Sequence, residues 1–335
     1  MKQVQIEKNA LPELIQRWAQ SAQVVAPVKK ENFTAFEVIT NPEEIELERA
    51  HNTRYPLKAL FLPQSEVLFR YHNGEYLPAE AQDSTRVIFG ARPCDARALT
   101  LLDTVFEEEG SQDPYWKTRR AAASVVGIGC DQPCESCFCT TVGSGPFDRS
   151  GLDVLVTPVD GKYALEAVTE KGQTLLANLP ELSASEQKQV EEIQQRAASQ
   201  MKAAFDPAGV RDKLYAIFES EYWKQVQQSC LGCGVCTFLC PTCFCFDIVD
   251  ETQRGERVRN WDTCMFSVYS LEASGHNPRP SRLERTRQRL MHKYAYWLDH
   301  IDQIGCTGCG RCVRYCPVGL DIREMIRRAQ AWEEA

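Results

Sequence analysis

The sequence predicts an α+β protein with two domains, an N-terminal α/β domain over residues 1–205 and a mostly helical domain over residues 206–335. Strand-like and helix-like patterns alternate in the first half. The cysteines form two groups, Cys94 to Cys139 and Cys230 to Cys316. Between the groups, a charged, Gln-rich helical stretch ends at the Asp206-Pro207 break, where we place the domain boundary.

The first half begins with an amphipathic helix pattern over residues 1–18. Three strand patterns follow: FTAFEVI from Phe33, KALFLPQSEVLF from Lys58 and RVIFGA from Arg86. The next segment has apolar residues at helical spacing, and Asp95 is well placed to cap that helix. The apolar run ASVVGIG then predicts a buried strand. Strand, helix and strand in this order predict parallel strands joined by a right-handed crossover.

Two further patterns complete the expected elements. DVLVTPV and KYALEAV flank Asp160-Gly161, a strong hairpin signal. In the second half, SRLERTRQRLMHKYAYWL from Ser281 predicts a helix.

The second half also contains two runs with the same cysteine spacing, C-x2-C-x2-C-x3-C-P, from Cys230 and from Cys306. This is the ligand spacing of two-cluster bacterial ferredoxins, in which the fourth cysteine of each run ligates the other cluster. The spacing predicts two [4Fe–4S] clusters. The first ferredoxin set is Cys230, Cys233, Cys236 and Cys316, and the second ferredoxin set is Cys306, Cys309, Cys312 and Cys240.

Structural zinc is the alternative, because zinc sites also use C-x2-C pairs. A zinc site needs neither the third cysteine step nor the Cys-Pro ending, so the spacing favours iron–sulfur clusters and electron transfer. More than sixty residues separate Cys240 from Cys306. This long insertion favours a helical ferredoxin domain over the small two-hairpin type.

A third metal site is predicted in the first half. Cys94 and Cys130 each follow directly on a predicted strand, and parallel strands place them at one carboxyl edge of the sheet. The loop that continues to Cys139 brings further thiols to the same edge. Cys137 and Cys139 flank Phe138, which puts both on one side of an extended segment, and Cys134 is the cysteine that we leave out, although spacing alone does not decide this. Packing as a small buried residue is the alternative for Cys94.

Four cysteines lie outside these sets: Cys134, Cys243, Cys245 and Cys264. A fourth metal site on the last three, with a non-cysteine ligand, competes with simple packing, which we favour. Arginines are dense between Arg254 and Lys293. They compensate cluster charge, form a solvated helix face, or offer a docking surface to an acidic partner.

Composition excludes several classes of protein. The net charge of −8 makes nucleic acid an unexpected partner. No apolar stretch approaches the roughly 18 residues of a membrane span, and the N-terminus lacks the apolar block of a signal peptide, so we expect a cytoplasmic protein. Sixteen cysteines then argue for metal ligands, and for an anaerobic or low-oxygen cell. No G-x-G-x-x-G follows a strand and no catalytic constellation stands out, which indicates a redox relay without its own substrate site.

The chain resembles the iron–sulfur β subunit of cytoplasmic NiFe hydrogenases (sulfhydrogenases), and it is similar to the iron–sulfur electron-transfer subunit of anaerobic sulfite reductase. The resemblance covers nearly the whole chain. Its motifs are RPCDARAL, CDQPCESCFCTTVGSGP, LCPTCFCFDIVDE, RVRNWDTCMF, EASGHNPRP and both ferredoxin runs. It implies three [4Fe–4S] clusters and no catalytic centre, with the N-terminal cluster held by Cys94, Cys130, Cys137 and Cys139.

The resemblance also implies partners. Such proteins pass electrons between a flavoprotein subunit, which binds FAD and NAD(P)H, and a catalytic partner. For this chain the expected catalytic partner is the pair of hydrogenase small and large subunits. The alternatives are an anaerobic sulfite reductase and a flavin-based complex of heterodisulfide-reductase type, in which the relay is the same and the partner differs.

Overall fold

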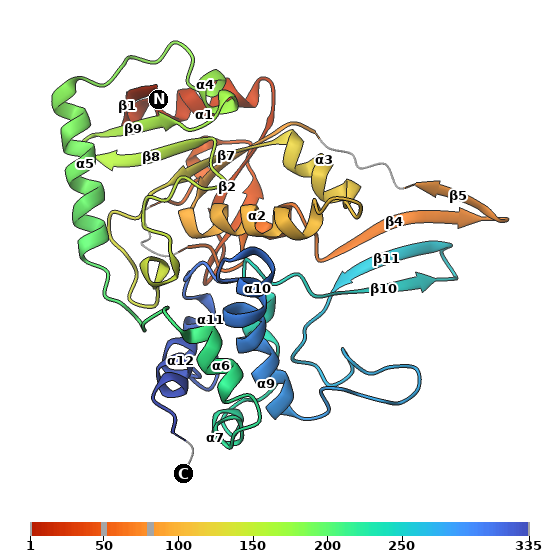
Figure 1. The fold of residues 1–335 in the computed structure, drawn as a ribbon. Helices are drawn as coiled ribbons and strands as arrows, with labels where there is room; N and C mark the ends of the chain where they lie inside the picture. Colours follow the sequence, from red (N-terminus) through yellow and green to blue (C-terminus); the bar gives the residue numbers. More distant parts are fainter. Residues whose placement is uncertain (1, 48–51, 79–83, 334–335) are drawn as a thin grey trace. The chain divides into compact units, whose positions relative to one another are not determined.

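The computed structural model describes residues 2–47, 52–78 and 84–333 (Figure 1). The chain divides into two compact units. The first unit comprises Met1–Phe61, Ala81–Lys202 and Thr307–Cys309, and the second comprises Leu62–Glu80, Ala203–Cys306 and Gly310–Ala335. Along the chain, the main change from the first unit to the second comes after Lys202, close to the boundary that the sequence predicts at residue 205. Two short segments, 62–80 and 307–309, group with the unit on the other side of that boundary.

The first unit is built on a seven-stranded sheet with strand order β1-β9-β8-β7-β6-β2-β3. The strands are β1 (Gln3–Glu7), β2 (Gln23–Lys29), β3 (Thr34–Val38), β6 (Arg86–Ala91), β7 (Ala123–Ile128), β8 (Val154–Val159) and β9 (Lys162–Ala167). The four central strands β8, β7, β6 and β2 pair in parallel with one another, and the edge pairs are antiparallel. The predicted parallel pairing of the two apolar strands β6 and β7 is therefore confirmed.

Helices of the first unit cover this sheet. They are α1 (Leu11–Ala19), α2 (Pro93–Phe106), α3 (Pro114–Ala122), α4 (Glu170–Leu175), α5 (Ala184–Ser199) and the 3-10 turns η1 (Lys8–Ala10), η2 (Pro42–Glu44), η3 (Leu57–Leu60) and η4 (Cys139–Val142). Buried side chains of α1 pack on apolar strand residues to form the core, where Trp18 lies 6.0 Å from Phe89 between ring centroids. This packing holds the central strands β6 and β7 in place, and Cys94 and Cys130 follow the carboxyl ends of these strands.

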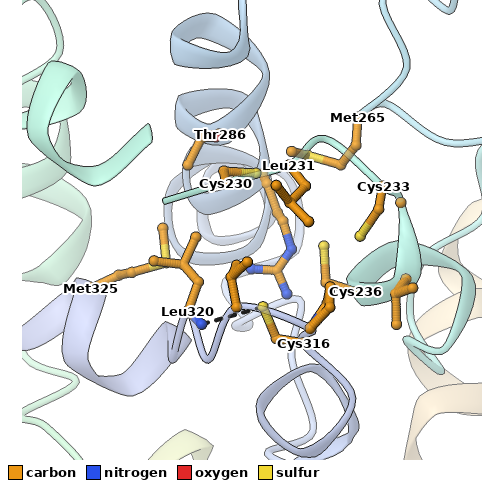
Figure 2. A pocket seen from close by; sticks show the side chains of 14 residues that line it. Cys230, Leu231, Cys233, Cys236, Met265, Thr286, Cys316, Leu320 and Met325 are labelled. Carbon is orange, nitrogen blue, oxygen red and sulfur yellow. Dashed lines mark hydrogen bonds between the residues drawn. The ribbon is translucent and has the colours of Figure 1, made fainter. Parts of the chain in front are cut away.

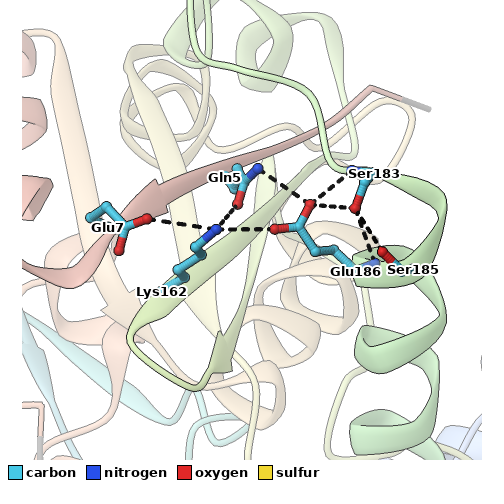
Figure 3. Close-up of polar contacts among 6 residues, drawn as sticks. All are labelled: Gln5, Glu7, Lys162, Ser183, Ser185 and Glu186. Atoms are coloured by element: carbon cyan, nitrogen blue, oxygen red, sulfur yellow. Dashed lines mark hydrogen bonds and ion pairs between the residues drawn. The ribbon is translucent and has the colours of Figure 1, made fainter.

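Polar contacts join α5 to the edge of the sheet (Figure 3). Ser183 caps the helix and exchanges hydrogen bonds with Glu186 in a capping box. Lys162 on β9 donates to Glu186 (3.1 Å) and to Gln5 on β1 (2.9 Å). Hydrogen bonds from Ser183 and then from Lys162 lower the pKa of Glu186 from 4.5 to about 2. The carboxylate is therefore ionised throughout the neutral range.

The second unit contains a four-stranded antiparallel sheet and seven α-helices among its described residues. The sheet has strand order β10-β11-β4-β5, with β4 (Ser65–His72), β5 (Glu75–Pro78), β10 (Phe246–Glu251) and β11 (Glu256–Trp261). The helices are α6 (Val210–Ala216), α7 (Tyr222–Gln227), α8 (Val235–Phe238), α9 (Arg282–Met291), α10 (Trp297–Ile301), α11 (Arg311–Arg314) and α12 (Ile322–Gln330). A π-helical turn, η5 (His292–Tyr296), joins α9 to α10, so the predicted helix from Ser281 runs through all three.

Several local predictions need correction. The first residues form β1 before the helix starts at Leu11, because the alternation that buries Val4 and Ile6 has the period of a strand. Asp95 lies inside the first turn of α2, and Arg92 occupies the N-cap position instead. The segment from Lys58 becomes a strand only at Ser65.

The sheet of the second unit is the largest difference from the expected, mostly helical domain. Its hairpin β10–β11 pairs with β4, a strand from far earlier in the chain. Within the described ranges, no helix is long and apolar enough to cross a membrane.

Candidate iron–sulfur sites

The first ferredoxin set lines one pocket of the second unit (Figure 2). Cys230, Cys233 and Cys236 come from the first run, and Cys316 joins them from the second run. Gly234 precedes α8 with a left-handed backbone (φ 76°), a conformation that glycine adopts without a Cβ penalty. The exchange of fourth cysteines expected from the spacing thus places these four sulfurs around a common space.

Backbone donors point at this set. The amide of Leu320 donates to Cys316 Sγ (3.2 Å), and the amide of Gly232 donates to Cys230 Sγ (3.4 Å). Amide hydrogen bonds to cluster thiolates are one of the ways in which a protein tunes an iron–sulfur centre. Cys233 is exposed, so one side of the set is open to solvent.

The donor set of this pocket fits an iron–sulfur cluster. Four thiols, contributed by both runs, line the same pocket. A [4Fe–4S] cube is held by four cysteine thiolates. The first ferredoxin set therefore supplies the donor chemistry of a [4Fe–4S] cluster.

The second ferredoxin set is more buried. Cys240, Cys306 and Cys309 are each less than one-tenth exposed. Thr242 Oγ1 lies 3.3 Å from Cys240 Sγ and donates to the carbonyl of Gly305 (2.7 Å), the residue before Cys306. Burial raises the pKa of the Cys312 thiol, the charge of Arg289 partly offsets this, and the charges of Cys306 and Cys240 add to the rise, which brings the pKa to about 12. Cys306, Cys312 and Cys240 therefore lie near one another in the second unit.

Two cations of the second unit lie beside these cysteines. Arg289, on α9, lines the pocket of the first ferredoxin set. Lys293, on η5, donates to Thr242 Oγ1 (2.9 Å) and to the Gly305 carbonyl (3.0 Å). Burial by itself lowers the pKa of Lys293, but the sulfurs of Cys240, Cys243 and Cys306 outweigh it and raise the pKa above its ordinary value. The ammonium group is therefore charged.

In the first unit, Cys94 and Cys130 lie at the carboxyl ends of adjacent parallel strands. Cys94 is in the first turn of α2, three residues after β6, and Cys130 follows β7 by two residues. Burial raises the pKa of the Cys130 thiol, and the charge of Arg92 partly offsets this. A buried thiol of raised pKa is a poor free nucleophile, and a metal is what would hold it as thiolate.

The loop after Cys130 holds the other predicted ligands. The Cys139 thiol has a pKa raised to about 12 by burial and by the charge of Cys130, which places these two sulfurs within electrostatic range of each other. Cys137 is bonded to Cys134 in a disulfide. Ligation by Cys137 therefore requires the reduced thiol, and Cys134 is the competing residue for the same position.

The segment Thr307–Cys309 contacts this loop within the first unit. Phe138 donates its amide to the Gly308 carbonyl (2.8 Å), and Cys137 Sγ lies 3.7 Å from the Cys309 carbonyl oxygen. Asn52 links both sides, because its Nδ2 donates to the Cys309 carbonyl (3.0 Å) and lies 3.7 Å from Cys94 Sγ. Cys309 of the second ferredoxin set thus lies next to Cys137, and Asn52 connects it to Cys94.

Comparison with known proteins decides the family. Residues 229–320 match the model of the 4Fe-4S dicluster domain. The chain is 30% identical over 328 residues to sulfhydrogenase 2 subunit beta of Pyrococcus furiosus, with 96% of each chain covered. No solved structure matches the chain.

The chain belongs to the sulfhydrogenase β-subunit family.

The predicted resemblance is thereby confirmed. A dicluster domain in a sulfhydrogenase β-subunit relative indicates [4Fe–4S] clusters and an electron-transfer role. The matched residues 229–320 contain all eight cysteines of the two ferredoxin sets.

Two of the four cysteines outside the predicted sets, Cys245 and Cys264, form a thiol pair in the second unit. A hydrogen bond with Cys245 raises the pKa of Cys264, and burial adds to the effect. Tyr269 also hydrogen-bonds to Cys245.

Several residues beside the cysteines were not singled out from the sequence. They are Asn52, Arg92, Thr242 and Gly308. Arg92, Thr242 and Gly308 lie within the motifs of the resemblance. Their contacts are with segments distant in sequence, and the motifs by themselves do not show those contacts. Arginine density did point to Arg289, although the same pattern includes Arg254, which is exposed on the β10–β11 turn.

Proposed function

We propose that this chain relays electrons through three [4Fe–4S] clusters, with an NAD(P)H-linked flavoprotein subunit on one side and the small and large subunits of a NiFe hydrogenase, the catalytic partner, on the other. The proposed ligands are the two ferredoxin sets and the sheet-edge set. The sheet-edge set is Cys94, Cys130, Cys137 and Cys139.

One observation carries the proposal. Cys316 lines the same pocket as Cys230, Cys233 and Cys236, although it belongs to the second run. A structural zinc site has no need of this exchange between runs, whereas a two-cluster ferredoxin requires it. A [4Fe–4S] cluster accepts and returns one electron, and the eight cysteines supply two such centres.

The third cluster rests on the sheet edge of the first unit. The chain brings Cys94 and Cys130 to one edge through parallel strands, and the Cys130–Cys139 loop adds the remaining thiols. Ligation by Cys137 needs the Cys134–Cys137 disulfide to be reduced, the state in which a cytoplasmic thiol pool keeps cysteines. Within the first unit, the contacts of Asn52 with Cys309 and of Phe138 with Gly308 support a place for Cys309 beside the proposed sheet-edge cluster.

The open side of the first ferredoxin set supports an exchange point with a partner. Cys233 is exposed, and the neighbouring Leu231 is 60% exposed. An exposed apolar side chain beside an exposed cluster ligand is what a docking redox partner would cover. Three of the four cysteines of the second ferredoxin set are buried and Cys312 is half-buried, which suits an internal step of the relay.

The first test is the metal and cofactor content of the native complex, purified anaerobically through a tag on this chain. Nickel together with flavin is the expected result. Sirohaem without nickel would move the partner to an anaerobic sulfite reductase, and flavin with neither would favour a heterodisulfide-reductase-type complex. A colourless chain with stoichiometric zinc would refute electron transfer.

The ligand assignment is tested by single substitutions in the tagged chain. The unaltered chain should bind about twelve iron atoms, as three four-iron clusters do. Cys94→Ser and Cys137→Ser should each bind about four fewer, with both ferredoxin clusters kept. Cys134→Ser is the matched control and should bind the full amount. Loss of iron in Cys134→Ser, with full binding in Cys137→Ser, would exchange the roles of these two residues.

A further inference from the structure

Two buried cations of the second unit stand on the same helical face. Arg289 and Lys293 are four residues apart across the junction of α9 and η5, which places them one above the other. Arg289 is 7% exposed and Lys293 is 2% exposed. In the part of the chain that the structure describes, neither forms an ion pair with a carboxylate.

Arg289 faces the first ferredoxin set. It lines the pocket that Cys230, Cys236 and the other two cysteines surround. Its Nε is buried and has no hydrogen-bond partner among the described residues. A guanidinium is always charged, and burying it without a compensating charge is costly. The compensating negative charge therefore lies on the sulfur side of the pocket.

Lys293 faces the second ferredoxin set. Its Nζ donates to Thr242 Oγ1, which itself lies 3.3 Å from Cys240 Sγ. Its other acceptor is the carbonyl of Gly305, directly before Cys306. Both contacts are with neutral acceptors beside cysteines of this set, so the ammonium charge is compensated only if those cysteines carry negative charge.

We propose that Arg289 and Lys293 raise the reduction potentials of the two ferredoxin clusters, Arg289 at both sets and Lys293 mainly at the second ferredoxin set. This inference rests on the proposed function. It assigns the level of both potentials to Arg289, and the difference between them to Lys293, rather than to the cysteine ligands.

The physical reason is the charge change on reduction. A cube held by four thiolates is anionic in both usual redox states, and reduction adds one more negative charge. A nearby buried cation stabilises the reduced state more than the oxidised state, and low local polarity strengthens the effect. Arg289 acts on both sets because it lies near Cys236 of the first and near Cys312 and Cys240 of the second.

The experiment is an anaerobic redox titration of the purified complex, followed by electron paramagnetic resonance. Arg289→Met should lower the reduced-to-oxidised ratio of both ferredoxin clusters at least tenfold at a fixed solution potential, which is about 59 mV for a one-electron couple. Lys293→Met should produce a shift of this size in one cluster and a smaller shift in the other. Arg289→Lys keeps the charge and should restore most of the ratio.

Arg285→Met is the matched control. Arg285 lies one turn earlier on α9, has the same 7% exposure and likewise has a buried Nε without a hydrogen-bond partner among the described residues. It differs because it donates to the carbonyls of Arg279 and Pro280 and does not line the pocket of the first ferredoxin set. Arg285→Met should change the reduced-to-oxidised ratio of either ferredoxin cluster by less than half of the change that Arg289→Met produces. Equal shifts in Arg285→Met and Arg289→Met, or equal shifts of both clusters in Lys293→Met, would overturn the inference. Absence of cluster signals in the unaltered complex would instead refute the proposed function.

Discussion

Substitution of Gly308 tests the contact between the ferredoxin segment and the N-terminal cysteine loop. Gly308 has a left-handed backbone (φ 64°). A Cβ at this position would lie 2.5 Å from the backbone nitrogen of Cys139 and 2.5 Å from the carbonyl carbon of Phe138. Both are backbone atoms, so they cannot move aside as the end of a flexible side chain would. The segment carrying Cys309 would have to separate from the loop.

The expected cost of Gly308→Ala has three contributions. The left-handed conformation costs an alanine about 1–2 kcal/mol. Overpacking against backbone costs about 1–3 kcal/mol. Loss of the hydrogen bond from Phe138 to Gly308 (2.8 Å) costs about 1 kcal/mol. We therefore expect a destabilisation of about 3–6 kcal/mol, with displacement of a cluster ligand on each side.

Gly209→Ala is the control. Gly209 has nearly the same backbone angle (φ 67°), and a Cβ there would meet nothing within 4 Å. It should cost only the backbone part, about 1–2 kcal/mol. The assay is anaerobic urea unfolding of both variants, compared through their midpoints at a common slope, together with iron content. If the two variants differed by less than about 1 kcal/mol and bound equal iron, the argument from close backbone approach would be wrong.

Two further predictions concern charged side chains that form polar contacts, Glu186 in the first unit and the Arg259–Glu66 pair in the second. Glu186 has a lowered pKa in the folded state, so its contribution to stability is complete above its ordinary pKa of 4.5 and is lost as pH falls through the folded value of about 2. The melting temperature of the unaltered protein should exceed that of Glu186→Gln at pH 7, and the difference should vanish near pH 2; a difference that does not change with pH would contradict this. In the sheet of the second unit, Arg259 Nε donates to Glu66 Oε1 (3.0 Å), and both side chains are buried. Glu66→Leu and Arg259→Met should each cost about 3–5 kcal/mol, and the double variant should cost less than their sum because it leaves no unpaired buried charge. Additive costs in a double-mutant cycle would show that the pair is not coupled.

Some local features of this protein could be predicted from the sequence. The strands β6 and β7 are apolar runs bounded by turn residues, and their order around a helix predicts the parallel pairing that the structure has. The cysteine spacing predicts a 4Fe-4S dicluster domain, and the family model matches residues 229–320, which contain both runs. These features depend on residues close together in the chain.

Other features depend on contacts between distant segments, and only the tertiary structure decided them. The pairing of β4 with β11 joins strands nearly two hundred residues apart, and no local pattern encodes which strand supplies the partner. The contact of Asn52 with Cys309 and the contact of Gly308 with Phe138 of the cysteine loop likewise join residues that are distant in sequence.

Arginine density in the sequence indicated charge near the clusters, but burial separates Arg289 from the exposed Arg254. Periodicity and motif spacing describe how a segment is built locally. The packing of segments that are distant in sequence determines which side chains face a proposed cluster. That packing depends on many residues throughout the core, so a local pattern does not predict it.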